Sequence, residues 1–166
     1  MRKTVADLLA EGLRVPTSGI VIEDRAATWA LLCKLVADKS PTASQDCQND
    51  RSAMSPVELA INSVRGVAVE AAIEYGVWVQ GHVSSSEGTP RTLSDCPELR
   101  LKVESLLDPA VEPTRAVRAV LGRSFPRLVY LDKPWAATLS SRLFSEDKLG
   151  QASWSTYLLF CSAFDD

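Results

Sequence analysis

The chain has 166 residues, of which 46% are hydrophobic and 23% are charged, as expected for one globular domain of ordinary size. Its net charge of −3 argues against a general polyanion-binding protein. No apolar stretch in the sequence reaches the ~18 residues that a bilayer-spanning helix needs. Because Asp7 and Glu11 interrupt the stretch that would be apolar in a signal peptide, we expect a cytoplasmic protein.

The first third of the chain predicts two helices and a polar connection. Apolar residues at helical spacing indicate a helix over Val5–Arg14 and a second one from an Asp24 cap to about Asp38. Between them, Gly19–Ile22 is the only plausible strand, and one strand does not form a sheet. Residues 39–54 are polar, and we expect them to be a mobile loop.

The clearest local signal follows that loop. The segment Ser55–Glu58 has the form of a capping box with proline at the first helical position, and Met54 and Leu59 are placed as a hydrophobic staple. The apolar stripe beyond it predicts a single helix over residues 56–83, which would be about 40 Å long. A helix of this length needs neighbours along its whole length.

A second mobile loop is predicted at residues 84–94, and shorter helices follow it. They are expected to start near Asp95, Pro113, Arg127 and Asp132, and after Gly150. The sequence therefore predicts an all-α fold in one domain over residues 1–166, built as an irregular stack of antiparallel helix pairs that resembles a degenerate helical repeat or α-solenoid. Since the final helix stays apolar as far as Phe160, we expect either a piece of a longer protein or a chain that meets a partner there.

The sequence carries no pattern typical of a catalytic centre. Its one histidine, His82, falls at a predicted helix end, where it is interpreted as a partner of the helix dipole or as solvated. The cysteines lack the paired spacing of a zinc site and are expected to be reduced; they are Cys33, Cys47, Cys96 and Cys161. No nucleophile elbow and no phosphate-binding loop occurs. We therefore predict a protein that is not an enzyme and has no metal or cofactor.

Polar residues within the long apolar helix are candidates for a site or for a structural role. Glu70 and Glu74 share one helix face, either as a carboxylate pair for acid–base chemistry or, as the favoured interpretation, as a solvated acidic face. Asn62 and Arg65 are predicted to form a buried polar network with a carboxylate such as Glu70 or Asp132, which would fix the register of the helices.

Basic residues outnumber acidic ones between Pro109 and Ser145, whereas the rest of the chain is acidic. The candidate contacts for a polyanion or a partner in this strip are Arg115, Arg118, Arg123 and Arg127. A basic strip can bind nucleic-acid phosphates. It can equally dock on an acidic neighbouring domain or remain solvated, and these alternatives are favoured because few aromatic residues are interleaved with the arginines.

Two segments resemble known sequences: Ala60–Gly66 (AINSVRG) and Leu121–Asp132 (LGRSFPRLVYLD). They are similar to stretches in the helical C-terminal regions of large, mostly uncharacterised bacterial proteins, some of which belong to anti-phage defence systems. The similarity covers about Ser55 to Phe160 and brings no catalytic residue with it. It implies a helical scaffold that recognises or connects.

The leading hypothesis from the sequence is thus a non-catalytic helical scaffold or interaction module for protein–protein or interdomain contact. The alternative is a nucleic-acid-associated helical domain that uses the basic strip. A third hypothesis, which we favour least, is an enzyme that uses Glu70 and Glu74 with a metal ion.

Overall fold

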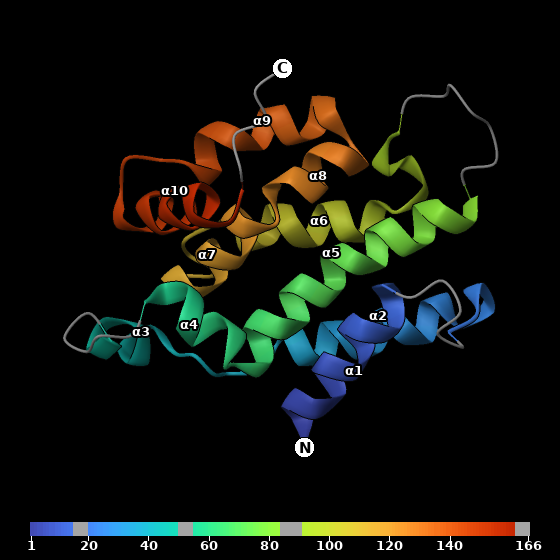
Figure 1. The fold of residues 1–166 in the computed structure, drawn as a ribbon, viewed down its shortest axis with the longest axis horizontal. Helices are drawn as coiled ribbons and strands as arrows, with labels where there is room; N and C mark the ends of the chain where they lie inside the picture. Colours follow the sequence, from blue (N-terminus) through green and yellow to red (C-terminus); the bar gives the residue numbers. More distant parts are fainter. Residues whose placement is uncertain (15–19, 50–54, 84–90, 162–166) are drawn as a thin grey trace.

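The computed structural model describes residues 1–14, 20–49, 55–83 and 91–161, and these segments form helices joined by short connections (Figure 1). The all-α prediction is confirmed, because the described residues contain no strand. The α-helices are α1 (Arg2–Arg14), α2 (Arg25–Val36), α3 (Ala43–Asn49), α4 (Pro56–Ile61), α5 (Val64–Val83), α6 (Pro97–Leu106), α7 (Arg115–Arg123), α8 (Phe125–Leu131), α9 (Lys133–Leu143) and α10 (Lys148–Phe160). Two short 3₁₀ helices, Ile22–Asp24 and Leu93–Asp95, precede α2 and α6. Among the described helices, none is long and apolar enough to span a membrane.

The predicted helix over 56–83 is wrong in one respect, because it is broken between α4 and α5. The capping box that starts α4 is present, with the Ser55 hydroxyl accepting from the Glu58 amide and the Glu58 carboxylate accepting from the Ser55 amide. The break lies at Ser63, whose hydroxyl donates to the Ala60 carbonyl at 2.9 Å and accepts from the Gly66 amide at 3.0 Å. A serine in this position competes with the helix backbone and caps a new helix. The proposed staple partner Met54 lies outside the described residues.

The loop predicted at residues 39–54 contains a helix. Thr42 begins α3 with a reciprocal pair of hydrogen bonds, in which its hydroxyl accepts from the Gln45 amide at 3.1 Å and its own amide donates to the Gln45 side chain at 2.8 Å. Asp46 of α3 is buried and binds Arg115, so a contact far away in sequence stabilises this polar helix. Of the loop predicted at 84–94, residues 84–90 lie outside the description and residues 93–95 are helical.

The start of α9 agrees with prediction, whereas that of α10 does not. Asp132 caps α9 by accepting from the Trp135 amide at 2.9 Å. Gly150, expected to separate two helices, lies inside α10, which starts after Asp147. A Cβ at Gly150 would lie within 2.4 Å of the Ser145 backbone nitrogen and closer still to its carbonyl oxygen. This glycine therefore allows a close backbone approach rather than ending a helix.

Helix α5 runs through the middle of the molecule, and helices from both halves of the chain pack on it (Figure 1). Its direct neighbours include α1 and α2 on one side and α7 and α8 on another. Many of its buried residues are small, among them Ala68, Ala71, Ala72 and Gly76, which lets neighbouring helices approach closely. Since α5 contacts segments far apart in sequence, the structure does not confirm the repeat character expected of a solenoid, in which each unit contacts only its neighbours.

Helix α10 is held against α7 by a tight crossing at Gly122. A Cβ on Gly122 would lie 2.2 Å from the Ser153 carbonyl oxygen. The Ser153 hydroxyl also donates to the Arg118 carbonyl at 3.0 Å. The first half of α10 is therefore fixed to the body of the protein by backbone contact.

Hydrogen bonds among Arg25, Tyr75 and Glu98 connect α2, α5 and α6. The Arg25 guanidinium donates to the Glu98 carboxylate at 2.7 Å and to the Tyr75 hydroxyl at 3.0 Å, and that hydroxyl donates to Glu98 at 2.8 Å. Burial favours the protonated form of Glu98, but the hydrogen bonds from Arg25 and Tyr75 outweigh it, so the pKa of Glu98 lies below its usual range.

Candidate functional site

Glu70 and Glu74, the carboxylate pair identified in the sequence, form ion pairs with three arginines from different helices. Arg14 at the end of α1 donates to Glu70 at 2.7 Å and to Glu74 at 3.2 Å. From the other side, Arg127 of α8 lies 2.9 Å from Glu74, and Arg123 at the end of α7 lies 3.5 Å from Glu70. The Glu70 and Glu74 side chains are only 12% and 7% exposed, so the favoured interpretation as a solvated acidic face is wrong.

This arginine–glutamate cluster, formed by Arg14, Glu70, Glu74, Arg123 and Arg127, carries three positive and two negative charges. Burial alone would lower the pKa of Arg14, but the negative charges of Glu70 and Glu74 outweigh it and raise that pKa overall. Three guanidinium groups against two carboxylates leave the cluster with one surplus positive charge.

The other two arginines of the predicted basic strip bind different partners and do not form a common face. Arg115 reaches α3, where its backbone and side-chain nitrogens donate to the Asp46 carboxylate at 2.9 and 3.0 Å. Arg118 is 2% exposed and donates to the Leu107 and Arg142 carbonyl oxygens at the ends of two helices. Burial lowers the pKa of Arg118. These contacts are structural, and they give no support to an open polyanion-binding strip.

The polar network predicted around Asn62 and Arg65 is divided among other partners. Asn62 is exposed and donates to the Glu58 carbonyl of its own helix at 2.9 Å. Arg65 is largely buried and pairs with Glu112 at 2.8 Å rather than with Glu70 or Asp132. Glu112 follows α6 in the chain and its side chain is 5% exposed, so its pairing with Arg65 depends on tertiary packing that helical spacing does not reveal.

The isolated histidine and the described cysteines have structural contacts. The His82 Nδ1 lies 2.8 Å from the Trp78 carbonyl oxygen in the last turn of α5, so Nδ1 carries the hydrogen. Cys33, Cys96 and Cys161 have free thiols, and the side chain of Cys47 lies outside the described residues. Among the described residues, no group of three or more histidine, cysteine or acidic side chains could hold a metal ion.

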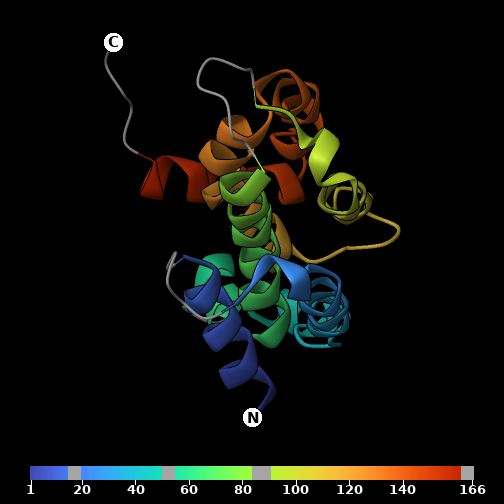
Figure 2. The same ribbon diagram turned by 90° about the vertical axis from the view of Figure 1, so that its right-hand side faces the viewer.

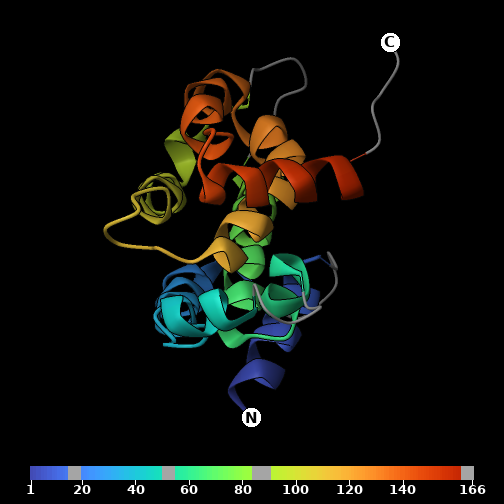
Figure 3. The ribbon, with the colours of Figure 1, turned by 90° about the vertical axis from the view of Figure 1, so that its left-hand side faces the viewer.

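Four exposed apolar residues lie close together in sequence at the end of α10, whereas the other exposed apolar residues of the described segments are scattered. Leu158, Leu159 and Phe160 are 60%, 70% and 51% exposed, and Trp154 one turn earlier is 48% exposed. Figures 2 and 3 show, from opposite sides, that this end extends beyond the helices that pack on the first half of α10. We call these four residues the α10 apolar end.

Basic side chains border the α10 apolar end. The Arg123 guanidinium lies over the Phe160 ring, 5.2 Å from its centroid. Burial raises the pKa of the adjacent Cys161 thiol, and the nearby positive charges of Arg127 and Arg123 oppose that rise. The apolar surface is therefore edged by the arginines of the arginine–glutamate cluster.

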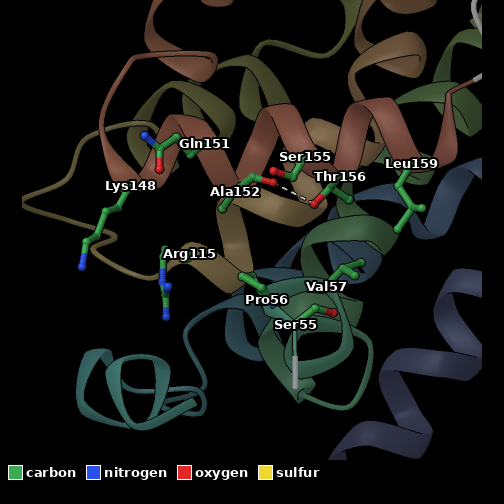
Figure 4. Close-up of a pocket in the computed structure, with 10 residues that line it drawn as sticks. All are labelled: Ser55, Pro56, Val57, Arg115, Lys148, Gln151, Ala152, Ser155, Thr156 and Leu159. Carbon is green, nitrogen blue, oxygen red and sulfur yellow. Dashed lines mark hydrogen bonds between the residues drawn. The ribbon is translucent and has the colours of Figure 1, made fainter. Parts of the chain in front are cut away.

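A cavity lies beside this surface, between α10 and the start of α4 (Figure 4). It has a volume of about 320 Å³, and Leu159 lines it together with Val57 and Ala152. The Arg115 and Lys148 side chains lie together at one end of the cavity, at the opposite end from Leu159 (Figure 4). The α10 apolar end is therefore continuous with a concave surface that could accept a partner's side chain.

Sequence reasoning missed Arg14, which joins both carboxylates of the cluster. Its only sequence signal was a basic residue in the last turn of the first helix, which is a common arrangement at helix ends.

Comparison with known proteins adds no assignment: no family model matches the chain, and neither the curated proteins nor the solved structures contain a significant match.

Proposed function

We propose that this chain is a non-catalytic interaction module that binds an amphipathic helix of a partner protein or neighbouring domain through the α10 apolar end. The observation that carries the proposal is the exposure of Leu158, Leu159 and Phe160 in succession. Consecutive helical residues point about 100° apart, so these three cover more than half of the helix circumference. A surface helix of a globular domain normally turns its apolar face towards the core of that domain, whereas these three residues are exposed.

The charges around the α10 apolar end define the chemistry of the partner. Arg123 and Arg127 keep 31% and 40% of their side chains exposed next to it, although each also contacts a carboxylate of the cluster. An apolar helix face flanked by aspartate or glutamate would complement this border. Full burial of each leucine or phenylalanine side chain is worth about 1.5–3 kcal/mol, so the apolar residues would supply most of the affinity.

A displayed library of amphipathic peptides, selected on the purified protein, tests this proposal. The double variant Leu158→Asp/Leu159→Asp serves as the altered surface. Leu101→Asp is the matched control, because Leu101 is 66% exposed on α6. We expect enriched peptides with apolar residues at helical spacing and acidic flanks, whose affinity falls at least about tenfold on the double variant and stays unchanged on the control.

Circular dichroism of both variants verifies that each remains folded. Peptides that bind the double variant as tightly as the parent protein would refute the proposal. So would a concentration-dependent dimer of the parent protein that the double variant loses, because a second copy would then cover the α10 apolar end.

A further inference from the structure

A second cavity adjoins the arginine–glutamate cluster, between the end of α1, the last turns of α5 and Tyr130 of α8. Its volume is about 380 Å³, within the range of small-molecule sites. Trp78 and Leu13 provide its apolar surface, and both are almost fully buried. Arg14, Glu74, His82 and Tyr130 contribute its polar groups.

The charge in this cavity favours an anion. Glu74 contributes the negative charge, but its Oε1 already accepts a hydrogen bond from Arg14 and forms an ion pair with Arg127, and these two positive charges offset it. Arg14 uses Nε and Nη2 for the two carboxylates, so its Nη1 has no partner among the described residues. The cluster has one positive charge in excess. Glu11, whose negative charge acts on Arg14, and Arg91, which lies over the lining residue Tyr130, add one charge of each sign. The surplus therefore stays at one positive charge, which matches one negative charge on a ligand.

The cavity also offers aromatic surfaces and a hydrogen-bonding nitrogen. The Trp78 and His82 rings are 4.9 Å apart between centroids, and Tyr130 lies at the rim with the Arg91 guanidinium over its ring at 3.8 Å. Because His82 Nδ1 is directed at the Trp78 carbonyl, Nε2 remains for another partner. A planar ligand body could pack against these rings.

We propose that this cavity binds a small aromatic monocarboxylate, with its carboxylate at Arg14 Nη1 and its ring against Trp78. A carboxylate suits the site better than a phosphate dianion, because only one surplus charge is present. The cavity is lined by residues of α1, α5 and α8, and none of them belongs to the α10 apolar end, although both surfaces adjoin the arginine–glutamate cluster.

Calorimetric titration with 1-naphthoate tests the proposal, with neutral 1-naphthamide and inorganic phosphate as comparison probes. We expect saturable one-to-one binding of naphthoate and binding at least about tenfold weaker for the amide and for phosphate. Arg14→Gln should weaken naphthoate binding at least about tenfold. Arg123→Gln is the matched control, since it removes an arginine from the same cluster but does not line the cavity, and it should have a clearly smaller effect.

Nuclear magnetic resonance locates the bound probe even where a variant is destabilised. In the parent protein, naphthoate should shift the Trp78 indole and His82 imidazole signals. The proposal is overturned if naphthoate does not saturate, if the amide binds equally well, or if the shifted signals are those of Trp154 rather than Trp78. Equal losses for Arg14→Gln and Arg123→Gln would also overturn it.

Discussion

The close crossing of α7 and α10 at Gly122 gives a quantitative test of the fold. Gly122 of α7 faces the Ser153 backbone of α10, and a Cβ there would lie 2.2 Å from the Ser153 carbonyl oxygen. Ordinary contact begins at 3.4 Å, so Gly122→Ala places an atom 3.4 − 2.2 = 1.2 Å too close. Because the obstructing atom belongs to a helix backbone, no side-chain rotation can relieve the overlap.

The expected cost follows from two opposing effects. Overpacking at a tight contact costs about 1–3 kcal/mol, with this backbone clash at the upper end. Alanine recovers about 1 kcal/mol because it is the better helix former. We therefore expect Gly122→Ala to destabilise the protein by about 2 kcal/mol, which lowers Tm by about 4–8 °C in a chain of this size.

Gly81→Ala is the matched control, because a Cβ on Gly81 of α5 meets no described atom within 4 Å. It should stabilise the protein by about 0.5–1 kcal/mol through helix propensity alone. Urea unfolding followed by circular dichroism measures both variants. If Gly122→Ala is as stable as the parent protein or more so, the α7–α10 crossing described above is incorrect.

Three further predictions concern other parts of the molecule. The pKa of Glu98 is lower in the folded state than its unfolded value of about 4.3, so it stabilises the fold above that pH and loses this contribution as the pH falls through the folded pKa. Glu98→Gln should therefore cost stability at pH 7 and flatten the loss of stability between about pH 5 and pH 2 in urea titrations, whereas an unchanged slope would exclude the Arg25 contact. Burial raises the pKa of Cys96 to about 12, so its thiol should resist alkylation at pH 8 until urea unfolds the protein. Mass spectrometry should instead find the partly exposed Cys161 modified. Early modification of Cys96 would contradict its burial. Ser55→Ala removes the cap of α4 and should lower the unfolding free energy by about 1 kcal/mol, and no change would show that the cap contributes nothing.

Helix caps could be predicted from the sequence where a side chain forms hydrogen bonds with residues only a few positions away. The capping box at Ser55 and the cap at Asp132 involve residues three apart, so their spacing alone predicts them. The break at Ser63 is also local, but an apolar periodicity that runs through it concealed the competing hydrogen bonds of the serine hydroxyl.

Partners distant in the chain could not be predicted in the same way. Glu70 and Glu74 were identified as a pair, whereas their arginine neighbours come from the end of α1 and from the region around α8. Arg118 looked like part of a basic surface, because a periodicity argument does not tell whether an arginine finds buried carbonyl oxygens at two other helix ends. The same limitation applied to Arg65 and Glu112.

The sequence by itself determined that the chain is helical, where several helices begin, and that the last helix keeps an apolar surface to Phe160. Tertiary structure alone decided which arginines meet which carboxylates, which face of α10 is covered, and that α5 lies at the centre. The reason is physical: capping and helix periodicity act over three or four residues. Burial and ion pairing depend on elements that folding brings together, and the sequence pattern of one helix does not predict which other helices will contact it.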